Sequence, residues 1–592
     1  MEVIKRDGRK VDFDKQKIVA AIEGAFREQY PYEDDDMWNC AAKIANEIET
    51  ISETKDLHVE EIQDIVEKKL MATKYKDVAR AYIKYRYLHG MARDQYKDMM
   101  DAVAEKLTAK NVQNQNANVD EASFGGRIGE ASDVVMKKYA LEYLVSPMAR
   151  KNHENNEVYI HDLNSYAVGS HNCLSIPFDD LLAKGFNTRQ TDVRPAQSIN
   201  TAFQLVAVIF QIQSLQQFGG VSATHLDWTM VPYVRKSFYK HYKDGLKYIE
   251  KLSDRDIEVE TYSVVPIEEI PINDRRAWVC DDAWEYAYNM TIQECKQAVE
   301  GMYHNLNTLQ SRSGNQLPFS SINYGTCTLP EGRMVTKALI EASIKGVGKL
   351  HKTSIFPCGI FQCMKGVNRK PGDPNYDLFQ LALKSTAQRL YPNYANVDWS
   401  GNAGYDINDP RTYFSTMGCR TANGWDVNGF GQLKDGRGNI CPVTIIMPTL
   451  AMQAKELAED QTYDKYANVE DIFLYVLDQK INEARKMLIE RFDWICSQSP
   501  DAAKFMYENG LMAGYIPEEG IRSALKHGTL AIGQLGLAET LQILIGCDHT
   551  EERGMELAKK IEQLFKDRCA QFKNEYKLNF GVYYTPKFSW VA

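Results

Sequence analysis

The chain has 592 residues, which is enough for several domains or for one large catalytic barrel with additions. Hydrophobic residues make up 44% and charged residues 25% of it, a balance that excludes wholesale disorder and a fibrous protein. The net charge of −10 gives no general attraction for nucleic acid. We therefore expect no nucleic-acid partner, and any phosphate must be met by a local basic or N–H-rich pocket.

Membrane insertion and disulfide bonding are also disfavoured. No stretch reaches the ~18–20 uncharged apolar residues of a membrane-spanning helix, and residues 1–10 carry charges where a signal peptide needs an apolar core. We expect a cytoplasmic protein with no membrane contact. The 12 cysteines are too sparse for a disulfide scaffold, and none form a Cys-x-x-Cys pair. Cys358 and Cys363 are best interpreted as core residues, so we predict no metal site.

Residues 1–92 form a predicted N-terminal module. Residues 2–13 are typical of a short hairpin, with Asp7-Gly8 as its turn. Apolar spacings of three and four then predict helices at 15–28, 37–51 and 59–71. A last helix carries residues 78–86, and the polar stretch 108–120 ends the module.

From residue 93 to residue 592 long helices alternate with short apolar runs. Leu205–Phe210 lies within a helical pattern, whereas Val443–Met447 has the composition of a buried strand. Loops rich in Gly, Asn and Pro are expected at 311–326, 391–408 and 418–442. Alternation of strand, loop and helix over this length predicts an α/β barrel whose loops carry function.

The N-terminal module has a basic end. A glycine turn brings backbone N–H groups and the Lys5-Arg6 pair together, and Lys17 follows from the first helix, an arrangement that suits a triphosphate. The alternative is a solvated basic face. Both ends of the module, including Val78-Ala79-Arg80-x-Tyr82-x-x-Tyr85-Arg86, resemble the ATP-cone, a regulatory nucleotide-binding domain. This resemblance implies that ATP or dATP is bound by Lys5, Arg6, Lys17, His58, Arg80 and Arg86.

Three further segments stand out by their small polar residues. They are Ser170-His171-Asn172-Cys173-Leu174, residues 311–326, and Ser415-Thr416-Met417-Gly418-Cys419-Arg420-Thr421 followed by residues 435–439. A cysteine is usually a core residue. Cys419 differs because Gly418 and Arg420 flank it, a context that suits the tip of a loop inserted into a barrel.

These segments, with Asn116-Ala117-Asn118-Val119-Asp120 and Arg389-Leu390-Tyr391-Pro392-Asn393-Tyr394, resemble the anaerobic (class III) ribonucleoside-triphosphate reductases, which are glycyl-radical enzymes. The resemblance covers essentially the whole chain, and the ATP-cone is the usual N-terminal attachment of that family. It implies an α/β fold with a ten-stranded barrel around a central finger loop, behind a small, mostly helical cone.

The resemblance also implies roles for individual residues. Cys419 matches the finger-loop cysteine whose thiyl radical removes the 3′-hydrogen of a ribonucleotide, and Met417 flanks it. Cys173 matches the cysteine on the opposite face of the sugar, which helps to deliver reducing equivalents. Asn439 matches the asparagine that hydrogen-bonds the sugar hydroxyls. Formate is the implied reductant, whereas the neighbouring Cys441 keeps a thiol-based reductant open.

Substrate contacts are predicted in the first two segments. Hydroxyl and N–H donors around Arg312 offer an anion-binding cradle. The alternative is a turn that only shapes the mouth of the barrel. The predicted substrate-binding residues are Ser311, Arg312, Ser313, Ser320, Ser321, Asn323, His171 and Asn172.

One part of the family pattern is missing. Members of the family continue beyond a segment like Asn579–Pro586 with a radical glycine in an Arg-x-x-Gly-Tyr context and cysteine pairs for zinc, and neither occurs in this sequence. We expect the chain to be inactive alone. A truncated gene, an interrupted gene or a split enzyme completed by a separate polypeptide would each account for this. The implied partners are ribonucleoside triphosphates, deoxynucleotide effectors, a radical-SAM activating enzyme and a second copy of the chain.

Two rival functions are weighed here. One is a regulatory protein that keeps the nucleotide-binding cone but has lost the chemistry. The other is a different glycyl-radical enzyme related to formate acetyltransferase, which is disfavoured because that family has two adjacent active-site cysteines and no Cys-Cys pair occurs here.

Overall fold

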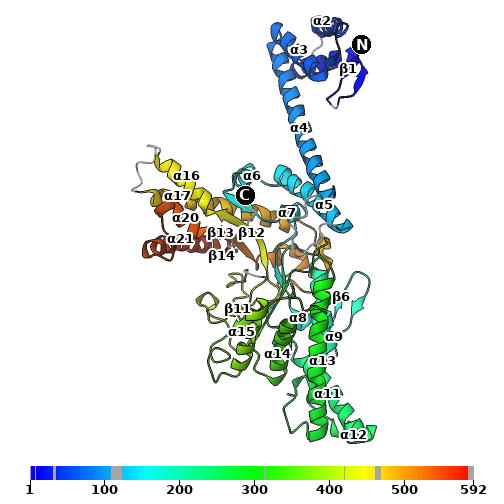
Figure 1. The fold of residues 1–592 in the computed structure, drawn as a ribbon, viewed down its shortest axis with the longest axis vertical. Coiled ribbons are helices and arrows are strands. Elements are labelled where there is room, and N and C mark those ends of the chain that lie inside the picture. Colours follow the sequence, from blue (N-terminus) through cyan, green and yellow to red (C-terminus); the bar gives the residue numbers. More distant parts are fainter. Residues whose placement is uncertain are drawn as a thin grey trace. The chain divides into compact units, whose positions relative to one another are not determined.

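The computed structural model describes residues 2–6, 8–30, 35–108, 123–312, 315–418, 421–459 and 468–584, with only the backbone for residues 88–96 and Tyr584. Contacts divide the chain into two compact units, Met1–Ala104 and Glu105–Ala592. Figure 1 gives the element labels.

The first unit is a helical bundle with a small sheet of order β2-β1-β3. Its elements are β1 (Glu2–Ile4), β2 (Lys10–Asp12), α1 (Lys15–Gln29), α2 (Asp35–Ser52), β3 (Leu57–His58), α3 (Val59–Ala72) and α4 (Lys76–Thr108). Asp14 caps α1 by accepting a hydrogen bond from the Gln16 N–H, which satisfies a backbone donor that the helix leaves open. Ile22, Ile48 and Leu70 are fully buried in its core.

The predicted hairpin and helices of this unit are confirmed. The Gly8 N–H donates to the Lys5 carbonyl at 2.9 Å, and Gly8 has φ +82°, a backbone region that favours glycine. Asp7, the other residue of the predicted turn, lies outside the described residues.

The second unit is an α/β structure. Its helices are α5 (Phe124–Tyr139), α6 (Pro147–Glu154), α7 (Leu163–Ala167), α8 (Phe178–Lys184), α9 (Ile199–Gln213), α10 (Leu226–Thr229), α11 (Val231–Tyr248), α12 (Asp254–Glu260), α13 (Asp281–Thr308), α14 (Pro330–Lys345), α15 (Tyr376–Arg389), α16 (Met447–Glu459), α17 (Val469–Cys496), α18 (Lys504–Glu508), α19 (Arg522–Leu525), α20 (Leu537–Ile545) and α21 (Glu552–Tyr576). The predicted helix over Leu205–Phe210 is confirmed within α9.

Two main sheets form the centre of this unit. The first is five-stranded and parallel, with order β11-β10-β9-β8-β5, and the second has order β14-β13-β12-β4. Their strands are β4 (Val158–Ile160), β5 (Leu174–Ser175), β8 (Val221–Ala223), β9 (Ser320–Tyr324), β10 (Cys358–Cys363), β11 (Asn393–Asn396), β12 (Asn439–Ile446), β13 (Thr529–Leu535) and β14 (Asn579–Tyr584). A separate hairpin pairs β6 (Phe186–Asn187) with β7 (Asp192–Val193). The strand predicted at Val443–Met447 is confirmed in β12, although β12 begins four residues earlier, within the loop expected at 418–442, and Met447 begins α16.

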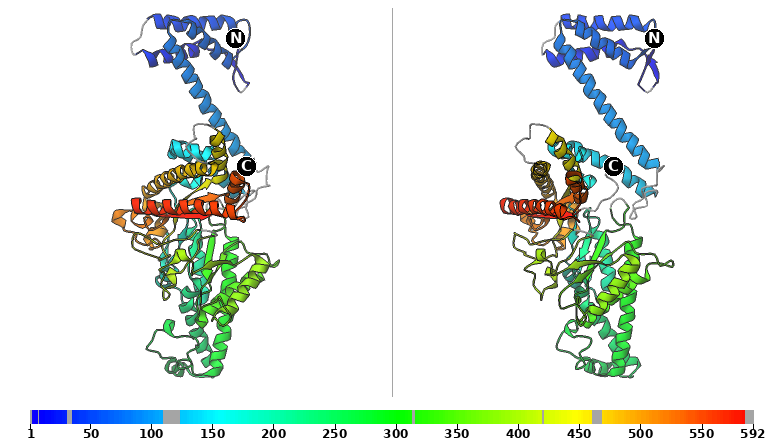
Figure 2. Two further views of the ribbon diagram at one scale, coloured as in Figure 1. Left: turned by 90° about the vertical axis from the view of Figure 1, so that its left-hand side faces the viewer. Right: turned by 60° about the vertical axis from the view of Figure 1, so that its left-hand side comes forward.

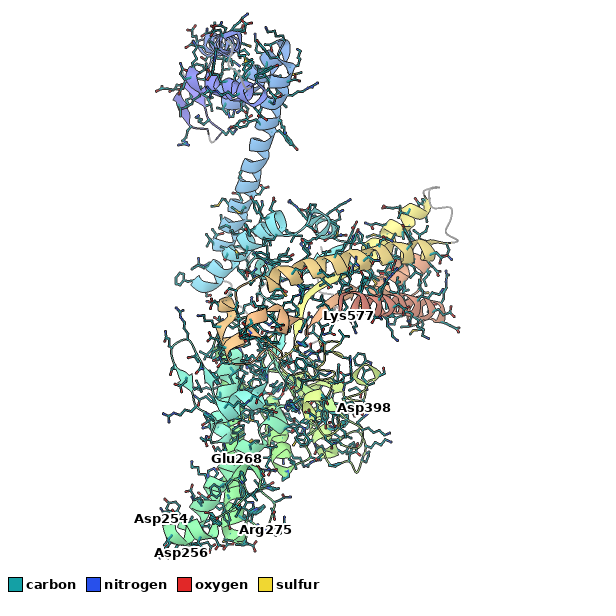
Figure 3. The ribbon with its side chains drawn as sticks, turned by 180° about the vertical axis from the view of Figure 1, so that it is seen from behind. Asp254, Asp256, Glu268, Arg275, Asp398 and Lys577 are labelled. Carbon is teal, nitrogen blue, oxygen red and sulfur yellow. The ribbon has the colours of Figure 1, made fainter. Side chains whose placement is uncertain are left out.

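Helices flank both sheets. In the views of Figures 1 and 2, α16, α17, α20 and α21 lie beside the four-stranded sheet, and α14 and α15 lie beside the five-stranded one. Lys577, labelled in Figure 3, has φ +53° where α21 ends and the chain turns into β14. The predicted α/β class and mostly helical first unit are confirmed, and the described strands contain no pairing of β11 with β14 that closes one barrel.

Two expected loops differ from prediction because each contains a strand. Residues 311–326 include β9, and residues 391–408 include β11. The sequence of β9 lacks a simple apolar pattern because Ser321 and Asn323 face backbone groups of another segment instead of an apolar core.

Candidate functional site

The two sheets are joined where Cys173 meets Asn439. The Cys173 N–H donates to the Asn439 carbonyl at 2.9 Å, and the Asn172 N–H donates to the Ile440 carbonyl at 2.9 Å. An added Cβ at Gly438 would lie 1.8 Å from the Cys173 carbonyl oxygen, so glycine is required for this close approach. Residues distant in sequence are therefore held side by side at the join.

Both side chains at this join are buried. Asn439 is 2% exposed, and its Oδ1 has no hydrogen-bond partner among the described residues. Cys173 is 6% exposed, and its Sγ accepts from the Gly220 N–H at 3.2 Å and lies 3.3 Å from Asn172 Oδ1. A buried amide oxygen without a partner is costly. Asn439 is therefore placed to accept a hydrogen bond from a bound molecule.

The segment Phe414–Gly418 crosses the five-stranded sheet and is held there by side chains of its strands. Asn323 Nδ2 donates to the Thr416 carbonyl at 3.0 Å, and the Thr416 N–H donates back to Asn323 Oδ1 at 3.1 Å. Ser222 Oγ also donates to the Thr416 carbonyl, at 3.0 Å. The Gly418 N–H donates to Ser321 Oγ at 3.0 Å. We call Phe414–Gly418 the finger segment.

Further contacts hold the beginning and the turn of the finger segment. Gln362 Nε2 on β10 donates to the Phe414 carbonyl at 3.0 Å. The Met417 N–H donates to the Thr421 carbonyl at 2.7 Å, and Thr421 Oγ1 donates to the Met417 carbonyl at 2.8 Å. Met417 is 2% exposed. Cys419 lies between these paired residues in the sequence but outside the described residues, so its role stays a prediction.

The predicted substrate-binding residues fall into two groups. Ser321 and Asn323 are engaged with the finger segment, whereas Ser320 Oγ and Ser311 Oγ are buried without a partner among the described residues. Ser313 lies outside the described residues. The roles assigned to all of these residues stay predictions.

His171, Asn172 and Arg312 lie on the side of the join that carries Cys173. Burial lowers the pKa of His171 to about 4, so its imidazole is neutral at physiological pH, and its Nε2 has no described partner. Burial also lowers the pKa of Arg312. Its Nη1 donates to Gln316 Oε1 at 2.7 Å, and its Nη2 donates to the Phe218 carbonyl.

A buried polar network that the sequence analysis missed lies after β5 and β8. His225 Nε2 is 3.0 Å from Asp179 Oδ2, and its Nδ1 is 2.6 Å from Thr224 Oγ1, which also donates to Asp435. Burial lowers the pKa of His225, but the charges of Asp179 and Asp435 outweigh it and raise the pKa to about 9. Burial raises the pKa of Asp435 to about 6. The sequence pattern that could have revealed this network is the pair of polar residues, Thr224 and His225, directly after the short strand β8.

A buried lysine follows the finger segment. Lys434 is 1% exposed, and its Nζ donates to the Asn423 carbonyl at 2.8 Å and to Gln432 Oε1 at 2.7 Å. Burial, helped by the nearby charge of Arg437, lowers the pKa of Lys434 to about 7. Asn423 in turn places its Nδ2 3.9 Å from the Met417 sulfur.

In the first unit, the Glu60 carboxylate forms ion pairs with two of the residues predicted to bind nucleotide. Glu60 pairs with Arg6 through Oε1 and with Arg86 through Oε2, the latter at 2.9 Å. His58 caps the same helix, α3, by accepting the Glu60 N–H at its Nδ1. The structure therefore brings Arg6, Arg86 and His58 together around Glu60.

The other predicted basic residues of this unit have local partners. Lys17 pairs with Asp14 at 3.4 Å, and Arg80 pairs with Asp77 at 3.5 Å, in each case three residues away in sequence. The Lys5 N–H donates to the Arg9 carbonyl at 2.8 Å in the hairpin turn. No contact in the described part of the chain joins Lys17 or Arg80 to Glu60.

Two protein-family models match this chain, one in each of its two units. A family model described as "Anaerobic ribonucleoside-triphosphate reductase" matches residues 115–589, and one described as "ATP cone domain" matches residues 1–91. The chain belongs to the anaerobic ribonucleoside-triphosphate reductase family. It is therefore an oxidoreductase with an N-terminal ATP cone, as the sequence resemblance implied.

Individual relatives agree with this family. The anaerobic ribonucleoside-triphosphate reductase of Escherichia coli (strain K12) is 29% identical, over 99% of this chain and 76% of that protein. The same enzyme of Enterobacteria phage T4 is 27% identical, over 81% of this chain and 71% of that protein. A crystal structure of the anaerobic ribonucleotide reductase from Thermotoga maritima in complex with dATP and CTP has a TM-score of 0.54 at 14% identity, covering 84% of this chain and 75% of that one, which shows a shared fold.

None of the helices in the described residues combines the length and the apolar character that crossing a membrane requires. Within the same described residues, His, Cys, Asp and Glu side chains form no group that fits a metal ion.

Proposed function

We propose that this reductase converts ribonucleoside triphosphates to 2′-deoxyribonucleoside triphosphates by thiyl-radical chemistry, with formate as reductant. The observation that supports this most is the join of Cys173 and Asn439, with the finger segment held on the adjoining sheet. A substrate at this join would contact the buried thiol of Cys173, and the sequence resemblance assigns the radical-bearing role to Cys419.

Four residues have roles in the proposed reaction. Cys419, as a thiyl radical, removes the hydrogen at C3′ of the ribose and returns it at the end of the turnover. Asn439 Oδ1 accepts a hydrogen bond from a sugar hydroxyl, which satisfies an atom that is otherwise buried without a partner. Cys173 supplies a hydrogen on the opposite face as the 2′-hydroxyl leaves as water. Met417 flanks Cys419 in the sequence.

The overall reaction balances with formate. One ribonucleotide, formate and a proton yield the deoxyribonucleotide, carbon dioxide and water. A thiol-based reductant at Cys441 is disfavoured because its side chain is fully buried, lies 3.6 Å from the Leu488 carbonyl oxygen, and has its pKa raised by burial to about 12. Such a thiol does not ionise readily for exchange with another thiol.

The radical itself needs a glycine in a context that these residues do not contain. A glycyl radical supplies the oxidising equivalent that forms the cysteine radical. We infer that this glycine, and the zinc site of the family, lie on a segment outside the 592 residues, either continuous with them or on a separate polypeptide. A radical-SAM activating enzyme, a homodimeric assembly and a cytoplasmic location complete the proposal.

The cone is proposed to regulate the enzyme by binding ATP or dATP, and deoxynucleotides act as further effectors. Arg6, Arg86 and His58 surround Glu60, which supports a phosphate site at this end of the cone. Lys5, Lys17 and Arg80 remain predicted members of the site.

Turnover by the reductase completed with a glycine-bearing polypeptide tests the function. Cys419→Ser is expected to abolish formation of dCTP from CTP, because an O–H bond is too strong to form the radical, while CTP still binds. Cys363→Ser, at a half-buried position on β10, is the matched control and retains turnover. Formation of dCTP by Cys419→Ser contradicts the assignment. Binding of ATP without any binding of CTP supports the rival function of a regulatory nucleotide-binding protein.

A further inference from the structure

Arg312 is a deeply placed cation without an acidic partner. It lies at the base of a turn whose ends pair Arg312 with Gln316, just before β9. Its guanidinium donates to an amide oxygen and to the Phe218 carbonyl, and it makes no ion pair with a carboxylate in the described part of the chain. Part of the residue remains accessible to solvent, although burial lowers its pKa. A small anion can therefore reach it.

One short backbone segment links Arg312 to the catalytic thiol. Arg312 binds the carbonyl of Phe218, whose own N–H donates to the His171 carbonyl at 3.2 Å. Two residues later, the Gly220 N–H donates to Cys173 Sγ at 3.2 Å. Residues 218–220 therefore accept a hydrogen bond from Arg312 and donate hydrogen bonds to the His171 carbonyl and to Cys173 Sγ.

A buried imidazole adds a polar group without a hydrogen-bond partner among the described residues. His171 is 3% exposed, its ring is neutral, and its Nε2 has no partner among the described residues. Buried polar atoms in native proteins are normally hydrogen-bonded, so an orphan nitrogen points to a missing ligand or water. His171 lies two residues before Cys173, on the same side of the join.

The surrounding charges favour a ligand with a single negative charge. Arg491 lies near this segment, with its guanidinium 4.9 Å from the Phe218 ring centre, but its Nη1 already donates to the His161 carbonyl at 2.6 Å. Asp162 and Asp133 act on Arg312 through longer-range electrostatics. These acids oppose a multiply charged triphosphate more strongly than a monoanion.

We propose that Arg312 and His171 form a binding site for a small monocarboxylate, next to Cys173. Resting on the proposed function, this ligand is formate: the guanidinium binds its carboxylate, and its C–H bond faces the reducing side of the sugar. In the balanced reaction Cys173 gives its hydrogen to C2′, and the electron pair of the formate C–H bond replaces the electrons that the thiol has supplied. The formate carbon leaves as carbon dioxide, and the 2′ oxygen leaves as water with the added proton.

Binding of ¹³C-labelled sodium formate to the 592-residue chain, followed by NMR line broadening, tests the site. Arg312→Gln is expected to weaken formate binding about tenfold or more, because a charge-assisted pair is lost. His171→Gln should weaken it less, and the exposed Arg276→Gln should leave it unchanged. Formate, but not the neutral analogue formamide, should slow alkylation of Cys173 by iodoacetamide, as measured by peptide mass spectrometry.

Controls separate this proposal from the proposed function. Thermal melting and CTP binding of each variant report folding and the substrate site. If CTP binds but Arg312→Gln binds formate as the parent chain does, the formate site is wrong and the reductase function stands. If inorganic phosphate displaces formate at lower concentrations than acetate does, the site is one for phosphate and the proposal is also wrong. If the parent chain does not bind CTP, the proposed function is contradicted.

Discussion

Asn323 and Thr416 exchange two hydrogen bonds, so a strand side chain replaces the backbone partner that Thr416 would have in a sheet. This pairing fixes the finger segment on β9. Asn323→Ala removes both bonds and leaves the Thr416 N–H without this partner, while the Thr416 carbonyl keeps its bond from Ser222 Oγ. We expect a loss of about 1–3 kcal/mol in the free energy of unfolding. Denaturant unfolding measures this loss.

The same variant should loosen the finger segment locally. Hydrogen exchange of residues 414–418 should speed up in Asn323→Ala, while β13 stays protected. Asn393→Ala, at an exposed position on β11, is the control and should change neither measurement. Unchanged exchange in Asn323→Ala would show that other contacts suffice to hold the segment.

Gly438 controls the approach of Cys173 to Asn439. Gly438→Ala places a Cβ 1.8 Å from the Cys173 carbonyl oxygen, so the strands must separate, and we expect destabilisation of about 1–3 kcal/mol or more. Gly424→Ala is the matched control, because nothing lies within 4 Å of the added Cβ. Thermal unfolding compares the two, and equal melting temperatures would contradict the close approach.

His225 should make stability depend on pH. Its pKa is raised to about 9 from 6.5, so the folded protein holds this proton more tightly than the unfolded chain. The stabilisation is fully present below about pH 6.5 and is lost as pH rises through about 9, with a size of roughly 1–3 kcal/mol. Lys434 has its pKa lowered to about 7 from 10.5, so its contribution to the free energy of unfolding increases as the pH rises between those two values.

His225→Gln isolates the histidine from these other groups. The difference in unfolding free energy between the parent and His225→Gln should shrink as pH rises from 6.5 to 9. His304→Gln, on the surface of α13, controls for an ordinary histidine. A difference that is constant over this range would show that His225 is not held as an imidazolium.

Nucleotide binding by the cone should depend on its basic residues. In the full chain, Lys5→Ala or Arg6→Ala is expected to weaken ATP binding about tenfold or more, because each removes a charge-assisted hydrogen bond. Lys84→Ala, at an exposed position on α4, should have no effect. Calorimetry measures the affinities, and an absence of ATP binding by the parent chain would refute the regulatory role.

Glu60 forms ion pairs with Arg6 and Arg86, so its carboxylate would compete with a nucleotide phosphate for these two arginines. Glu60→Gln removes the competing charge, so ATP should bind more tightly than to the parent chain. Glu67→Gln, which removes a carboxylate that pairs with Arg86 alone, should have a smaller effect. Weaker binding to Glu60→Gln would mean that Glu60 orients the two arginines for the nucleotide instead.

The elements with regular apolar spacing could be predicted from the sequence. The helices of the first unit, the helix around Leu205–Phe210 and the strand in β12 follow from local periodicity, which depends only on neighbouring residues. The strand β9 could not be found in this way. Its Ser321 and Asn323 are polar because they bind a backbone segment that comes almost a hundred residues later.

The sequence by itself determined the family and the cone at the N-terminus, because their motifs are continuous in the chain, and it predicted roles for Cys173, Cys419 and Asn439. Only the tertiary structure decided that Cys173 and Asn439 meet, that Asn323 holds the finger segment, and that Arg312 lies beside the Cys173 side of the join. The physical reason is that these contacts join residues far apart in sequence, and a buried hydrogen bond of this kind leaves no periodic pattern along the chain.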